Sequence, residues 1–429
     1  MSRNVFVLGL LDWQRQELET IERAHEDRFM PLLTFDELVV DPPGFDELLQ
    51  RCRRQIDRSG VRPDAIICHW DFPSSCLAPV LAAEYSLPGP ALEAVLKCEH
   101  KYWARLEQER VVAENIPRFQ ALDPFAPQAA DDIALDYPFW LKPVKGFSSK
   151  LGFRIESRRD LDEALAQMRE HIGELGRPFD DCLAHAHLPP EVAVIGGTWA
   201  LAEGIIQGVQ FAPEGYVQGG RVHLHGFFDM LMEEGALAAL RYPDRLPRGL
   251  RERAERVCQR ILGQVGYDDG CFNVEFLYDE PQDQLWVIEV NTRISQSHSE
   301  LFRRVDGMSN HEVAVSVALG ESPHLSQGAG RDRMAGKFWL LKHGDARVTR
   351  VPSAQELASI ERELDTLIEL NVAQGDRLSE LPHQPVHGFY VAEVFLGAGD
   401  EAGLFARRDA LIERLPIEFS DGGSLEMTR

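Results

Sequence analysis

The stretch from Cys271 to His298 reads CFNVEFLYDEPQDQLWVIEVNTRISQSH and gives the clearest indication of fold in this chain. Residues 272–278 and 285–291 are rich in aromatic and β-branched side chains, and polar residues 279–284 separate them. Such a pattern is typical of two strands joined by a short turn. We therefore expect a β-hairpin here.

The expected hairpin brings two acidic residues together. A register that pairs Tyr278 with Trp286 places Glu275 opposite Glu289, with Asn291 on the same face as Glu289. Facing like charges destabilise a hairpin unless a cation separates them, and oxygen ligands favour a hard divalent ion. The alternative is two solvated acids on an exposed face, although apolar residues flank each acid.

Composition excludes several classes of protein. The 429 residues carry a formal net charge of −24, which argues against nucleic acid as a partner because phosphate binding needs a basic surface. A hydrophobic content of 44% without a long apolar run predicts a globular protein with no membrane span. Seven scattered cysteines fit reduced thiols, so we expect a cytoplasmic location.

Strand and helix patterns alternate along the first part of the chain, which predicts a parallel α/β lobe at residues 1–90. The segment 92–115 reads as one long helical region, Asp160 as the cap of a helix over 160–172, and Gly215 as the turn before a strand over 215–228. A Gly/Ser/Gln-rich gap at 320–330 precedes a last α+β lobe (331–429) with its own strands at 337–341 and 389–395.

Two lysines stand where they would meet phosphate groups. Lys142 ends the apolar run FWLK and precedes a loop, 143–151, that contains Ser148 and Ser149. Backbone N–H groups and hydroxyls in such a loop can surround phosphates while the lysine supplies charge. Lys101 lies within the helical segment 92–115 and opens a helix–strand unit. Taken singly, a lysine-rich surface turn and a solvated helix face explain these residues equally well.

The order of these features resembles the ATP-grasp superfamily over roughly residues 90–320. Within it, Glu289 to Ile294 (EVNTRI) is most similar to the corresponding segment of biotin carboxylases. The resemblance implies an α/β ATP-grasp fold with an N-terminal parallel lobe and a small C-terminal lobe. The implied ATP-grasp domain spans 91–320 and includes a mobile lid at about 140–206.

The resemblance also implies roles for individual residues. Lys101 and Lys142 would contact phosphates of ATP, with Ser148 and Ser149 in the loop beside them. Glu203 and Ile205 would hold the adenine, and Gln210 would lie on the ribose or phosphate side. One or two Mg²⁺ (or Mn²⁺) ions would be bound by Glu275, Glu289 and Asn291. Arg293 would face the transferring phosphoryl group or the acyl intermediate, so Arg293 and Lys142 are the expected catalytic residues.

The sequence departs from biotin carboxylases after Ile294. Those enzymes continue with Gln-Val-Glu-His, whereas this chain has Ser295-Gln-Ser-His298, so Ser297 replaces the glutamate that serves bicarbonate chemistry. The expected activity is therefore an ATP-dependent ligase that couples a carboxylate to an amine through an acyl phosphate. Alternatives are an ATP-grasp carboxylase-like enzyme and a degenerate ATP-binding regulatory protein.

Residues after the hairpin are candidates for an acceptor pocket. Ser297 and His298 follow the metal ligands directly, and Arg303 or Arg304 could clamp a substrate carboxylate. An Arg pair on an ordinary helix surface is an equal alternative. The expected partners are ATP and small-molecule carboxylate and amine substrates, and a homodimer is a further expectation.

Overall fold

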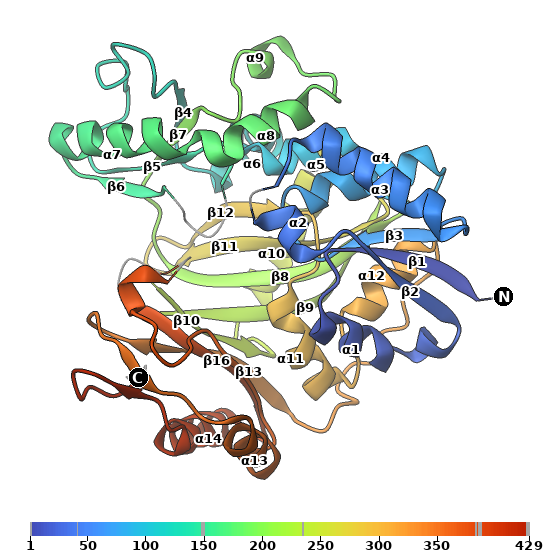
Figure 1. Cartoon of the computed structure of the whole chain (residues 1–429). Coiled ribbons are helices and arrows are strands. Elements are labelled where there is room, and N and C mark those ends of the chain that lie inside the picture. Colours follow the sequence, from blue (N-terminus) through green and yellow to red (C-terminus); the bar gives the residue numbers. More distant parts are fainter. Residues whose placement is uncertain are drawn as a thin grey trace.

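The computed structural model describes residues 2–40, 42–146, 151–233, 236–381, 384 and 388–425. Figure 1 shows an upper lobe that carries α7 and strands β4–β7, an N-terminal α/β lobe beside it, and a large sheet below. No helix within the described ranges is both long and apolar enough to cross a membrane.

The N-terminal lobe has the predicted parallel sheet, in the order β2-β1-β3. Residues 5–8 of β1 are each at most 1% exposed. A strand buried on both faces is characteristic of parallel sheets covered by helices. The elements of this lobe are β1 (Arg3–Leu8), α1 (Asp12–Thr20), η1 (Glu22–His25), β2 (Asp27–Leu32), α2 (Phe35–Val39), α3 (Phe45–Ser59), β3 (Ala65–Cys68) and α4 (Ser74–Glu84).

The segment predicted as one long helix is broken at His100. Helix α5 (Leu92–Glu99) ends there, α6 (Lys101–Val112) begins, and η2 (Ala113–Asn115) follows. His100 has extended backbone angles, and its Nδ1 accepts a hydrogen bond from the backbone N–H of Trp103 at 3.1 Å. The histidine thus caps α6. This break makes Lys101 the first residue of a new helix.

The upper lobe, which we call the lid, contains an antiparallel sheet in the order β4-β7-β5-β6. Helix α7 packs apolar residues, including Leu161 and Met168, against this sheet. Ser157 caps α7, and Asp160 lies within the first turn, so the predicted cap was wrong by three residues. The lid elements are β4 (Phe119–Leu122), β5 (Phe139–Pro143), β6 (Phe153–Ile155), α7 (Arg158–His171), α8 (Gly173–Leu183), α9 (Pro190–Ala193) and β7 (Ala200–Gly204).

The largest sheet has eight antiparallel strands in the order β12-β11-β8-β9-β10-β13-β16-β15. Its strands are β8 (Val209–Gln218), β9 (Arg221–Glu233), β10 (Ala236–Tyr242), β11 (Gly270–Asp279), β12 (Gln284–Asn291), β13 (Met334–Lys342), β15 (Leu367–Leu370) and β16 (Phe389–Ala398). The remaining elements are α10 (Arg248–Val265), α11 (Gln296–Asp306), α12 (His311–Ala318), β14 (Val348–Arg350), α13 (Ala354–Leu364), η3 (Leu378–Glu380), α14 (Glu401–Arg414) and β17 (Glu418–Phe419).

One sequence-based prediction about this sheet was wrong. Gly215 lies inside β8, and the turn occurs at Gly219 and Gly220, whose φ angles of 56° and 71° suit glycine. The two predicted C-terminal strands are present as β13 and β16, and β13 pairs with β10, so they continue the sheet that carries the acidic hairpin. The domain boundaries at 90 and 320 and closure of the lid stay predictions.

Candidate active site

The acidic hairpin consists of β11 and β12. Glu275 pairs with Glu289, as predicted, but Tyr278 pairs with Leu285 and not with Trp286. The register shifts next to Glu275, where Ile288 is the extra residue of a β-bulge. The bulge frees the carbonyl oxygen of Ile288, which accepts a hydrogen bond from Nη2 of Arg105 at 2.8 Å.

The environment of Glu275 makes its ionised form unfavourable when no cation is bound. Burial, followed by repulsion from Glu289, raises the pKa of the Glu275 carboxyl group. Gln210 donates to its Oε2 at 2.9 Å, and Asn291 donates to its Oε1 at 3.4 Å. Because Asn291 uses its nitrogen in this way, its side-chain oxygen is left for another ligand.

Lys101 lies at the same end of the hairpin. Its Nζ is 3.6 Å from Oε2 of Glu289 and donates to the carbonyl oxygen of Gly146 at 2.7 Å. Gly146 follows strand β5, so Lys101 joins the hairpin to the segment after that strand. Ser148 and Ser149, predicted to bind phosphate, fall outside the described residues.

Glu203 on β7 lies between two cations. Its carboxylate forms ion pairs of 2.5 Å with Nε of Arg105 and Nζ of Lys142, and all three side chains are largely buried. Burial alone would raise the pKa of Glu203, but the two cations outweigh it and lower the pKa to about 2. Burial lowers the pKa of Lys142, although Glu203 opposes that effect. The Glu203 side chain, predicted to hold adenine, is thus engaged by Lys142 and Arg105, and Ile205 lies just beyond this strand.

Arg293 is bound to the N-terminal lobe. Its Nε and Nη2 donate to the two carboxylate oxygens of Asp71 at 2.7 and 3.0 Å, a bidentate pair. Burial would raise the pKa of Asp71, but the charge of Arg293 outweighs it and the pKa is lowered. A second buried ion pair, between Lys145 and Glu99, lies near this one. Sequence reasoning missed Asp71, although it follows β3, and residues after parallel strands often belong to sites.

Glu214 on β8, 0% exposed, organises the segment that follows Arg293. Its Oε2 accepts hydrogen bonds from Ser295 N at 3.1 Å and contacts Nδ1 of His298 at 2.6 Å, while Oε1 accepts from Asn310 at 2.7 Å. Burial alone would raise the pKa of Glu214, but the adjacent histidines outweigh this effect and lower the pKa to about 2. His298, predicted to contact substrate, is thus 3% exposed and held by Glu214.

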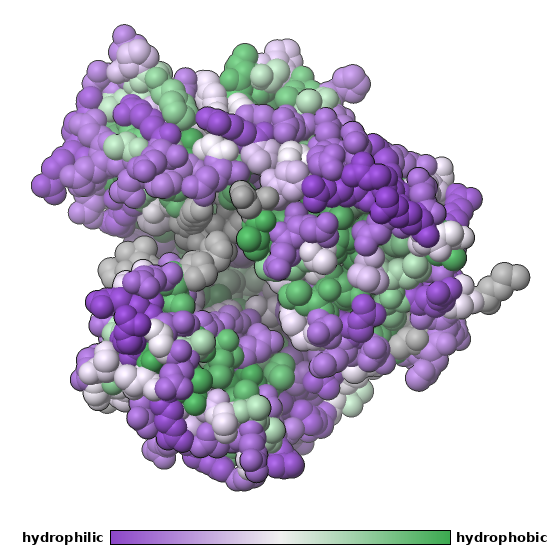
Figure 2. Space-filling model, viewed as in Figure 1, coloured by the Kyte–Doolittle hydropathy of each residue, from purple (hydrophilic) through white to green (hydrophobic). Residues whose placement is uncertain are grey.

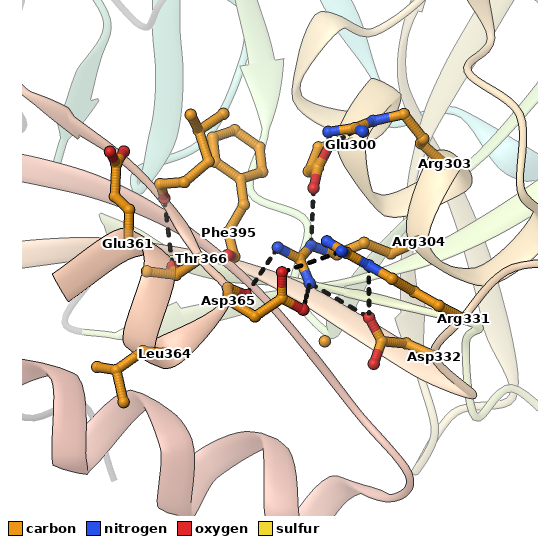
Figure 3. Close-up of polar contacts among 12 residues, drawn as sticks. Glu300, Arg303, Arg304, Arg331, Asp332, Glu361, Leu364, Asp365, Thr366 and Phe395 are labelled. Atoms are coloured by element: carbon orange, nitrogen blue, oxygen red, sulfur yellow. Dashed lines mark hydrogen bonds and ion pairs between the residues drawn. The ribbon is translucent and has the colours of Figure 1, made fainter. Parts of the chain in front are cut away.

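Arg303 and Arg304, the other predicted substrate contacts, are engaged in ion pairs on α11. Arg303 pairs with Glu300 and, at 3.6 Å, with Glu17. Figure 3 shows Arg304 among Glu300, Asp332 and Asp365, at 2.8, 3.2 and 3.5 Å. Arg304 is 2% exposed and joins α11 to the C-terminal lobe. We therefore propose a structural role for Arg304 in place of the substrate contact.

A hollow separates the lid from the large sheet, as Figure 2 shows. Lys142 and Glu203 come from β5 and β7 of the lid, and the acidic hairpin forms an edge of the large sheet. Each part thus contributes acids with a lysine beside them, residue types that suit a metal–polyphosphate ligand.

A family model described as an ATP-grasp domain matches residues 135–300. These residues are therefore similar to an ATP-grasp domain. The match includes Lys142 of the lid and both acids of the hairpin. It agrees with the sequence resemblance, and the ATP-grasp fold expected from that resemblance is confirmed.

Solved structures share the fold of this chain over nearly its full length. An L-amino acid ligase from Bacillus licheniformis has a TM-score of 0.70 at 17% identity, covering 97% of this chain and 98% of that chain. A biotin carboxylase from Campylobacter jejuni has a TM-score of 0.64 at 16% identity, covering 97% and 92%. An N5-carboxyaminoimidazole synthase from Aspergillus clavatus has a TM-score of 0.64 at 15% identity, covering 96% and 98%. No curated protein sequence matches the chain.

Proposed function

We propose that this protein is an ATP-dependent ligase that couples a carboxylate to an amine and releases ADP and phosphate. The facing pair Glu275 and Glu289, with Lys101 beside it, is the observation that carries the proposal. Acids that require a cation, next to a lysine and below the lid's Lys142, match the charges of a metal–ATP complex.

The donor set suits Mg²⁺. No cluster of three or more His, Cys, Asp or Glu within the described parts of the chain could hold a metal by itself. Mg²⁺, however, is usually bound by one or two carboxylates together with substrate phosphates and water. Glu275, Glu289 and the oxygen of Asn291 would supply the protein ligands. When bound, the ion would neutralise charge on the phosphates of ATP.

The reaction forms and breaks two bonds in sequence. A carboxylate oxygen of the substrate attacks the γ-phosphorus of ATP, and the bond to the bridging oxygen breaks so that ADP leaves with the electron pair. An amine nitrogen then attacks the acyl carbon, and phosphate leaves as the amine gives its proton to solvent or a base. Lys142 and Lys101 would hold the phosphates in line, since such transfers depend on positioning and charge stabilisation.

An amine acceptor is favoured over bicarbonate for two reasons. Ser297 stands where biotin carboxylases have a glutamate, and its Oγ accepts a hydrogen bond from Lys337 at 2.9 Å. Lys337 also pairs with Glu393 at 2.5 Å. Ser297 is therefore in contact with a lysine–acid pair of the C-terminal lobe. In addition, a structure described as an L-amino acid ligase shares this fold, with 97% of this chain and 98% of that chain covered.

ADP release with pools of carboxylates and amines tests the proposal. We expect ADP to appear with Mg²⁺ only when both a carboxylate and an amine are supplied. Turnover that requires bicarbonate would favour a carboxylase, and ATP binding without turnover in any pool would favour a regulatory protein. Matched reactions with EDTA should show no ADP release.

Substituting Asp71 tests the role of Arg293. In Asp71→Asn the guanidinium loses its charge partner but keeps a neighbour of the same shape, so Arg293 should be held less well. We expect turnover to fall about 10- to 100-fold, the scale of a misplaced catalytic group, with ATP affinity changed less than about twofold. Asp162→Asn on the exposed face of α7 serves as control. Unchanged turnover in Asp71→Asn would remove Arg293 from the catalytic residues.

A further inference from the structure

A cavity of about 710 Å³ lies against α6. Neither Lys101 nor Arg105, the residues of α6 that belong to the candidate active site, lines it. Tyr102, Leu106 and Glu109 line it, and their spacing of four and three residues places them on one side of the helix. Phe119, the first residue of β4, and Arg118, which precedes it, also line the cavity, as does Trp199 from the loop before β7. The proposed function makes no use of this cavity.

Its walls combine aromatic rings with two unpaired charges. The rings of Tyr102 and Phe119 meet edge to face at 5.9 Å, and Trp199 adds a third aromatic side chain. Glu109 and the Arg118 side chain are exposed, and neither forms an ion pair or side-chain hydrogen bond with any described residue. Burial, then the carboxylates of Glu191 and Glu109, raises the pKa of Tyr102, so negative charge lies near the ring.

We propose that this cavity binds a small zwitterion with an apolar or aromatic side chain, as in a free amino acid or a short peptide. The ammonium group would lie against Glu109 and the aromatic rings, where cation–π attraction adds to the ion pair. The carboxylate would be bound by Arg118, whose planar fork suits that group. The side chain would be buried among Leu106, Phe119 and Trp199.

The cavity is separate from the ATP site but borders it. Phe119 pairs directly with Glu203 in the lid sheet, so the two side chains lie on the same face of neighbouring strands. Glu203, which binds Arg105 and Lys142, is thus the neighbour of a residue that lines the cavity. The loop that carries Trp199 is also linked to Lys101 of the candidate active site through Val144. The N–H of Val144 donates to the carbonyl oxygen of Trp199 at 2.8 Å, and the N–H of Lys101 donates to the carbonyl oxygen of Val144 at 3.1 Å.

Calorimetry without nucleotide tests binding, with phenylalanine, leucine, glycine and the dipeptide leucyl-phenylalanine as probes. We expect phenylalanine or the dipeptide to bind at least about tenfold more tightly than glycine, because their apolar side chains would be buried in the cavity. Comparing the two probes distinguishes an amino acid from a peptide ligand. Trp199→Ala should weaken binding by a similar factor. Arg159→Ala, an exposed arginine on α7, is the matched control for charge removal.

Analogues of phenylalanine that lack one of its two charges test which residue binds the ammonium group and which binds the carboxylate. N-acetylphenylalanine has no ammonium group, so Glu109→Gln should lower the affinity for phenylalanine but leave the affinity for this ligand unchanged. Phenylalaninamide has no carboxylate, so Arg118→Ala should lower the affinity for phenylalanine but leave the affinity for the amide unchanged. These measurements involve no turnover, so they stand whether or not the ligase reaction is correct.

Three results would overturn the proposal. They are binding of none of the probes, equal binding in the Arg118 and Trp199 variants and the wild type, and displacement of the bound probe by ATP. The last would place the probe in the ATP site. Retained binding of a fluorescent ATP analogue in Trp199→Ala and Arg118→Ala would show that the variants are folded.

Discussion

Glu289→Gln is expected to lose ATP-dependent turnover by about 100- to 1,000-fold, the scale seen when one electrostatic stabiliser of a transition state is removed. Glutamine keeps the shape of the side chain but weakens a ligand for the divalent ion. Steady-state ADP release measures the effect. Glu280→Gln, in the exposed turn of the same hairpin, should retain wild-type turnover.

The same substitution should change stability little when no metal is present. It removes the repulsion between Glu289 and Glu275, worth about 0.2–1 kcal/mol, but also the ion pair of Glu289 with Lys101. Thermal unfolding in EDTA should therefore occur at nearly the same temperature in the variant and the wild type. Addition of Mg²⁺ and ATP should then stabilise the wild type more than the variant. Full activity in Glu289→Gln, or equal stabilisation of both proteins, would remove the metal assignment.

Glu203→Ala is expected to destabilise the protein by about 3–5 kcal/mol, because it leaves Arg105 and Lys142 without their shared acid. Urea unfolding measures this loss. The double variant Glu203→Ala/Lys142→Met removes one of the stranded charges and should recover part of the stability. Glu114→Ala breaks an exposed ion pair with Arg260 and should cost only about 0–1 kcal/mol.

Acid unfolding gives an independent measure of the same residue. The pKa of Glu203 falls from 4.5 to about 2 in the folded protein, so its carboxylate contributes stability that is complete above pH 4.5 and is lost as the pH falls towards 2. Glu203→Ala lacks this contribution. Its stability should therefore decline less steeply between these pH values than that of the wild type. Parallel slopes would contradict the buried ion-pair assignment.

The hairpin shows how far local pattern carries a prediction. Alternation with a period of two placed Glu275 and Glu289 on one face, and the structure confirms their pairing. The expected partner of Tyr278 was wrong because a bulge at Ile288 shifts the register. The signal for that bulge lies in Arg105, 183 residues away, which binds the freed carbonyl. Such a contact leaves no trace in the hairpin's own sequence.

The periodicity of the sequence gave wrong boundaries of helices and strands where a single residue ends or begins an element. His100 interrupts an otherwise continuous helical pattern, because its ring caps α6 instead of continuing α5. Glycines at 219 and 220 supply the turn that was predicted at Gly215, and Gly215 was misread because a glycine within a strand looks like a break. The boundaries of elements thus depended on single side-chain contacts.

The sequence by itself determined the residue types of the site: two facing acids with an asparagine, one lysine in a helical segment and another at the end of a strand. It also determined the alternation of strands and helices that leads to the ATP-grasp fold. Only the tertiary structure decided which acid neutralises which cation. Asp71 binds Arg293 across 222 residues, and Glu203 binds Arg105 across 98. Periodicity reports the face on which a side chain lies, whereas its partner is set by the packing of segments that are distant in the chain.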